Sequence, residues 1–139
     1  MSIKYRKLNT YKYSIMEDVQ IEVNIKPNTD VICTYMELSI NGILTIRKGY
    51  AWDGPSGPMI DTPDTMRGSL VHDVLYQMMR LNMLPLNFRK NADEMLKQIC
   101  IEDGMSEIRA IYMYEGVRLF GEQYAKPTPQ PEIQIYTAP

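Results

Sequence analysis

The sequence Val71-His72-Asp73-Val74-Leu75-Tyr76 is the centre of the stretch that decides the fold, residues 49–93. His72 is the only histidine in 139 residues, and Asp73 follows it directly. Tyr76 comes four residues after His72, so a helix would place both side chains on one face. This spacing predicts a helix that carries chemically active groups.

The segment before this motif, residues 49–64, breaks the hydrophobic periodicity and is stiffened by prolines. It contains Trp52, the only tryptophan, followed by Asp53, Gly54 and Ser56. Loops of this length inside compact domains are usually functional or disordered, and Trp52 and the flanking prolines argue for order. We therefore expect an ordered loop at a site, with Trp52 as a wall of its pocket.

The segment after the motif, Arg89-Lys90-Asn91-Ala92-Asp93, opens a second helical run and places Asp93 on it. Helical periodicity predicts three helices, at residues 65–82, 88–103 and 107–124. Capping residues support these bounds. They are Thr62 or Asp64 for the first helix, Asn87 and Gly104 for the start and end of the second, and Ser106 for the third. The apolar anchors expected in the third helix are Ile108, Ile111, Met113, Val117 and Phe120.

The first 48 residues read as strands. Apolar and polar residues alternate strictly over residues 19–25, and Asn41-Gly42 between apolar runs is a strong hairpin signal. Strands are expected at residues 11–15, 19–25, 31–40 and 43–47. The predicted fold class is α+β: a small N-terminal antiparallel sheet of three to four strands, a Gly/Pro-rich loop and three α-helices.

The length predicts one domain over residues 1–125, followed by a proline-rich extended tail over residues 126–139. The net charge of −2 and the lack of a Lys/Arg cluster argue against a nucleic-acid partner. No run has the roughly 18 apolar residues of a membrane span, and no signal peptide is recognisable. We expect a protein made in the cytoplasm of its host. The oligomeric state is left open.

A single histidine restricts the chemistry. Zinc sites of the histidine-rich catalytic type need two or three histidines. Ser56 lacks the strand-to-helix elbow of an activated serine. His72 can still act as a general base on water if a carboxylate such as Asp93 holds one imidazole nitrogen, with Tyr76 orienting that carboxylate. Asp73, Asp53 and the carbonyl of Gly54 are candidate oxygen ligands for Ca²⁺.

The pattern His72-Asp73-x-x-Tyr76, with Gly54-Pro55 before it and Ala92-Asp93 after it, resembles the secreted phospholipase A2 superfamily. The resemblance implies His72 as the base, Asp73 as the Ca²⁺ ligand, Asp93 as the partner of His72, and Tyr76 as its support. The cysteines that flank the motif in that superfamily are absent, since Val71 and Leu75 stand in their places.

Residues 43–121 also resemble a family of short phage and prophage proteins, which carry an aromatic-x-x-Asp-Gly loop, His-Asp-x-Leu-Tyr and Arg-x-x-Ala-Asp. The resemblance implies a phage protein, and association with the virion is one of the expectations. Three hypotheses follow. The protein is a metal-assisted hydrolase of an ester or amide of the host envelope, a non-enzymatic virion or assembly component that contacts other phage proteins, or an anti-defence binding protein. In the second, the same cluster of residues is a structural network.

Overall fold

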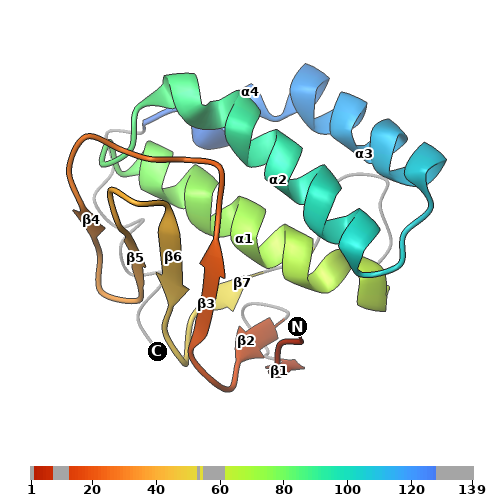
Figure 1. The fold of residues 1–139 in the computed structure, drawn as a ribbon, viewed down its shortest axis with the longest axis horizontal. Coiled ribbons are helices and arrows are strands. Elements are labelled where there is room, and N and C mark those ends of the chain that lie inside the picture. The colour runs from red at the N-terminus through yellow and green to blue at the C-terminus, as the bar shows by residue number, and fades with distance from the viewer. Residues whose placement is uncertain (1, 8–12, 53, 55–61, 128–139) are drawn as a thin grey trace. The chain divides into compact units, whose positions relative to one another are not determined.

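The computed structural model describes residues 2–7, 13–52, 54 and 62–127 (Figure 1). This part of the chain divides into two compact units, one that ends before Gly54 and one from Gly54 to Pro127. The first contains the strands and the second the helices. The predicted α+β class, with antiparallel strands first and helices after them, is confirmed.

The strands form two antiparallel sheets, where one was expected. The three-stranded sheet has the order β1-β2-β7, with β1 at Tyr5–Lys7, β2 at Tyr13–Ile15 and β7 at Ala51–Trp52. The four-stranded sheet has the order β3-β6-β5-β4, with β3 at Val19–Glu22, β4 at Val31–Ile32, β5 at Met36–Leu38 and β6 at Ile43–Ile46. The shortest strands, β4 and β7, have two residues each and are too brief to show a period in the sequence.

The hairpin at Asn41-Gly42 is confirmed, because β5 pairs with β6 across it. Gly42 has φ of +83°, and a Cβ there would lie 2.8 Å from the carbonyl oxygen of Val23, so glycine is required. The single strand expected over residues 31–40 is wrong. The chain turns back so that Val31 pairs with Leu38, and Ile40 is 48% exposed.

Trp52 belongs to an aromatic cluster in the three-stranded sheet. Its ring centroid lies 5.5 Å from that of Tyr13 and 6.0 Å from that of Tyr5. Trp52 is 2% exposed. Aromatic pairs at this separation stabilise beyond the area they bury, which gives Trp52 a packing role within its own unit.

The helical unit contains α1 (Pro63–Arg80), the 3₁₀ turn η1 (Leu86–Phe88), α2 (Arg89–Glu102), α3 (Glu107–Phe120) and α4 (Glu122–Ala125). Thr62 is the N-cap of α1 and forms a capping box with Thr65. Ser106 caps α3 by accepting a hydrogen bond from the backbone N–H of Arg109. Asn87 does not cap α2, because it lies inside η1.

Gly104 ends α2 as expected, with φ of +106°. The N–H of Met105 bonds to the carbonyl of Cys100 at 2.9 Å and that of Gly104 to Ile101 at 3.1 Å. Together these bonds make a Schellman motif, which satisfies the last carbonyls of the helix.

Helix α2 packs between α1 and α3 (Figure 1). At Gly68 of α1, a Cβ would lie 2.7 Å from Sγ of Cys100 on α2, so glycine permits this close approach. Arg67 adds ion pairs at 3.0 Å to both Glu102 and Asp103 at the end of α2. Two contacts at one end of the helix pair thus fix α1 against α2.

The expected third helix is divided at Gly121 into α3 and α4. Its apolar anchors are only partly confirmed. Met113 is 5% exposed, whereas Ile108 is 84%, Phe120 72% and Ile111 42% exposed. Hydrophobicity alone did not identify the face that packs on α2. No helix in the described ranges is long and apolar enough to cross a membrane.

Candidate functional site

The side chain of Asp93 on α2 is fully buried, with 0% exposure, and polar groups from three helices surround it. His72 and Tyr76 come from α1, Arg89 from the start of α2, and Arg118 from α3. We call these five residues the Asp93 cluster: His72, Tyr76, Arg89, Asp93 and Arg118.

Oδ1 of Asp93 accepts two hydrogen bonds from α1, from Nε2 of His72 at 2.7 Å and from the hydroxyl of Tyr76 at 2.6 Å. The rings of His72 and Tyr76, one turn apart, lie in contact at a tilt of 39°, with centroids 4.1 Å from each other. The spacing of four residues along α1 thus delivers both groups to one carboxylate oxygen.

Oδ2 of Asp93 faces two guanidinium groups. Nη1 of Arg118 donates to it at 2.8 Å, and Nη2 of Arg89 lies 3.9 Å away. Burial acts to raise the pKa of Asp93, but the hydrogen bonds from His72, Tyr76 and Arg118 outweigh it and the pKa is lowered. The carboxylate is therefore ionised at neutral pH.

An ionised Asp93 fixes the tautomer of His72. A carboxylate only accepts hydrogen bonds, so Nε2 must carry the proton, and in the neutral ring Nδ1 has a free lone pair. Among the described residues, every buried side-chain nitrogen or oxygen has a hydrogen-bond partner. The hydrogen bond of His72 uses Nε2. Nδ1 is thus at the accessible part of a side chain that is 11% exposed, where it can meet a water molecule.

Tyr76 is held in turn by Arg89, whose Nε donates to the tyrosine oxygen at 3.0 Å. Burial and the bond to Asp93 raise the pKa of Tyr76, so it remains a neutral donor. Arg89 also donates from Nη2 to the carbonyls of Val117 at 2.6 Å and Arg118 at 3.0 Å. A cation on the last carbonyls of α3 stabilises that end of the helix.

The Asp93 cluster therefore unites three of the residues singled out from the sequence, His72, Tyr76 and Asp93. Asp73 is partly buried on α1, and Gly54 is buried at the start of the helical unit. Asp53 and Ser56 lie outside the described residues, and Trp52 lies in the other unit.

The Ca²⁺ ligands expected from the sequence lie only partly within the described residues. Within residues 2–7, 13–52, 54 and 62–127, no group of three or more His, Cys, Asp or Glu residues could hold a metal ion. Asp73 and the Gly54 carbonyl are the members of the expected Ca²⁺ set that lie in these ranges. Ca²⁺ takes about six to eight oxygen ligands, so further donors would be needed.

Sequence reasoning missed the two arginines of the Asp93 cluster. A signal existed for Arg89, which stands four residues before Asp93, the spacing of an ion pair on one helix face. Arg118 is 25 residues from Asp93 and gave no local signal.

Comparisons of the chain with protein-family models, with curated proteins and with solved structures gave no match. The geometry of the Asp93 cluster is therefore the basis for a functional assignment.

Proposed function

We propose that the chain is a small hydrolase in which His72 activates water for attack on an ester or amide bond. The single observation that carries the proposal is the 2.7 Å hydrogen bond from Nε2 of His72 to the buried Asp93 carboxylate. A carboxylate on Nε2 orients the ring and stabilises the imidazolium that forms when Nδ1 takes a proton from water. General base catalysis of this kind contributes on the order of 10²- to 10⁴-fold in rate.

Tyr76 supports this role by a second bond to the same oxygen of Asp93. With two donors on Oδ1, the carboxylate cannot rotate without losing both, so the ring of His72 is held in one orientation. The proposed metal would polarise the scissile carbonyl. Asp73, Asp53 and the carbonyl of Gly54 are the ligands we propose for Ca²⁺, together with further loop carbonyls. The resemblance to phage proteins suggests an ester or amide of the host envelope as the substrate.

A second candidate function, a non-enzymatic phage component, is favoured by the arginines. Arg118 and Arg89 reduce the negative charge that Asp93 presents to His72, and Arg89 ties α3 to Tyr76. A buried carboxylate on α2 that accepts hydrogen bonds from both α1 and α3 is also what a structural network requires. In this reading His72 is one more donor that satisfies Asp93.

Two substitutions separate the candidates. His72→Gln keeps a polar side chain of similar reach but removes the base, and Asp93→Asn keeps the shape but no longer stabilises an imidazolium. For a hydrolase, both variants should remain folded while cleavage of ester and amide substrates, assayed with and without Ca²⁺, falls about 10²-fold or more. For a structural network, the parent protein should have no activity, and the two substitutions should change only the stability, by roughly 1–3 kcal/mol.

Because His72 is the only histidine, its ring can also be followed directly. Diethylpyrocarbonate can acylate one imidazole in this chain, so inactivation of the hydrolase should follow a single modification and reverse with hydroxylamine. Complete modification of His72, followed by the absorbance of the modified imidazole, without loss of activity would exclude His72 as the base.

A further inference from the structure

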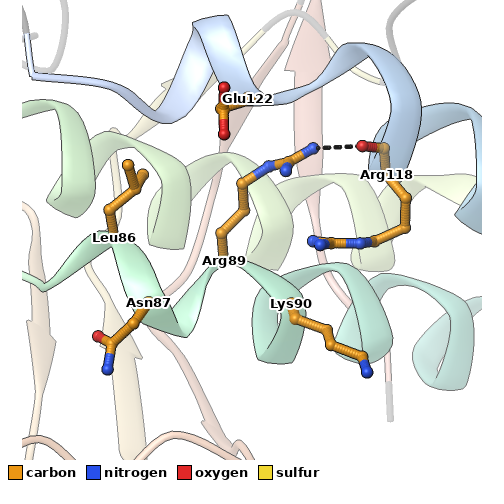
Figure 2. Close-up of a pocket in the computed structure, with 6 residues that line it drawn as sticks. All are labelled: Leu86, Asn87, Arg89, Lys90, Arg118 and Glu122. Carbon is orange, nitrogen blue, oxygen red and sulfur yellow. Dashed lines mark hydrogen bonds between the residues drawn. The ribbon is translucent and has the colours of Figure 1, made fainter.

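A pocket on the helical unit lies on the Arg118 side of Asp93. It has a volume of about 330 Å³, and Figure 2 shows the six residues that line it. Three of the six are cationic. The lining residues are Leu86, Asn87, Arg89, Lys90, Arg118 and Glu122. Small-molecule sites begin at about this volume.

Each cationic side chain of this pocket has at least one donor atom that makes no hydrogen bond to a described residue. Arg118 uses Nη1 for Asp93, while its Nε and Nη2 make no hydrogen bond to any described residue. Arg89 uses Nε and Nη2, which leaves Nη1 open. Lys90 is exposed and has no ion-pair partner in the part of the chain that the structure describes. Donors from two helices therefore line one hollow, in which Glu122 is the only acidic residue among the six described lining residues.

Arg89 is held in place before any ligand arrives. Its side chain is only 10% exposed and is fixed by Tyr76 and by the carbonyls of Val117 and Arg118. Figure 2 shows its guanidinium bonded to the Arg118 carbonyl within the pocket. A guanidinium that is already ordered loses little entropy on binding, and its planar fork matches the oxygens of a phosphate.

The charge balance of the pocket favours an anion. The pocket has three positive charges, from Arg89, Lys90 and Arg118. Two negative charges lie beside them, from the buried Asp93 and the rim residue Glu122, which leaves a local excess of one positive charge. Glu122 also pairs with Lys126 at 3.3 Å. This local excess is opposite in sign to the net charge of −2 of the whole chain.

We propose that this pocket binds a phosphate group. Its open donors belong to three cationic side chains that point in different directions (Figure 2), and a phosphate offers more acceptor oxygens to such donors than a carboxylate does. The inference is independent of catalysis by His72, because the pocket uses Nε and Nη atoms that the His72–Asp93 pair does not need.

The test is a titration with inorganic phosphate at constant ionic strength, read by calorimetry and by the backbone amide signals of residues 86–90 and 117–122. We expect saturable binding that Lys90→Gln weakens roughly three- to tenfold, the weight of one exposed charge contact. Lys97→Gln is the matched control, since it removes the same charge from α2 outside the pocket. Glu122→Gln should tighten binding by about two- to fivefold, and Glu115→Gln on α3 should not.

A second arm identifies the source of the phosphate. Co-sedimentation with phosphatidylcholine vesicles that contain phosphatidic acid, reduced by Lys90→Gln and by free phosphate, would assign the group to a lipid headgroup. Phosphate binding without vesicle binding would assign it to a soluble phosphate ester. The proposal is overturned if phosphate gives no saturable response, or if all four variants respond alike. Vesicle binding without a response to inorganic phosphate would overturn it as well.

Discussion

Arg118 on α3 donates from Nη1 to Oδ2 of Asp93 on α2 at 2.8 Å, on the side of the carboxylate opposite His72. Asp93 is fully buried, and Arg118 is 31% exposed. The pair gives the buried charge a cation that still reaches solvent. It also couples the end of the helical unit to the residues that we propose for catalysis.

Removing this cation should destabilise the protein. Arg118→Gln leaves Asp93 with the more distant guanidinium of Arg89, at 3.9 Å. We expect a loss of about 1–3 kcal/mol in the free energy of unfolding, measured by urea denaturation. Arg109→Gln is the control, because its ion pair with Asp64 is longer, at 3.4 Å, and more exposed. Equal losses in the two variants would show that Asp93 does not depend on Arg118.

Loss of the Tyr76 hydroxyl should lower the free energy of unfolding by a comparable amount. Tyr76→Phe removes the donor to Asp93 and the acceptor for Nε of Arg89, which leaves both groups short of a partner. We expect a loss of about 1–3 kcal/mol in thermal or urea unfolding. Tyr112→Phe removes the same atom from a side chain that is 67% exposed and should change stability by less than about 0.5 kcal/mol.

Stability should depend on pH through Asp93. Its folded-state pKa is lowered, because the bonds from His72, Tyr76 and Arg118 overcome the effect of burial. The stabilisation is therefore fully present above the unfolded pKa of about 3.9 and is lost as pH falls below it. The stability difference between the parent and Asp93→Asn should shrink as the pH falls from about 5 through the lowered folded-state pKa of Asp93. Asp30→Asn, an exposed carboxylate that accepts from the Ile40 N–H, is the control. A difference that stays constant with pH would contradict an ionised Asp93.

Calcium should raise the stability if the proposed ligand set is right. At a hundred times the dissociation constant, mass action adds about 2.7 kcal/mol. The melting temperature should rise in millimolar Ca²⁺ and the rise should vanish in Asp73→Asn. An unchanged melting temperature in Ca²⁺, Mg²⁺ and Mn²⁺ would leave the metal-free alternatives.

Two glycines of the C-terminal helices should respond in opposite ways to alanine. At Gly121 a Cβ would lie 2.5 Å from the Val117 carbonyl and 2.8 Å from the Tyr76 hydroxyl, so Gly121→Ala must displace part of the Asp93 cluster. We expect a loss of about 1–3 kcal/mol. At Gly116 no atom of the described chain lies within 4 Å of the added carbon, and Gly116→Ala should stabilise α3 by up to about 1 kcal/mol. Calorimetric unfolding of both variants gives the comparison, and a stable Gly121→Ala would show that the helix end can move.

The sequence by itself determined the features that depend on neighbouring residues. Local periodicity predicted the α+β class and three long helical runs, and Asn41-Gly42 predicted the hairpin because glycine readily adopts the positive φ of that turn. The spacing of His72 and Tyr76 placed both on one face of α1, since 3.6 residues make one turn. Thr62, Ser106 and Gly104 marked helix ends for the same local reason.

Only the tertiary structure decided which distant groups share the Asp93 carboxylate. Arg118 is 25 residues away, and nothing in its local sequence distinguishes it from a solvated arginine on a helix surface. Packing of α3 on α2 brings it to Asp93, because a buried charge must find a partner from whichever helix lies beside it. The same packing exposes Ile108 and Phe120 while burying Met113. The contact face of a helix depends on its neighbour, so hydrophobicity along the chain could not specify it.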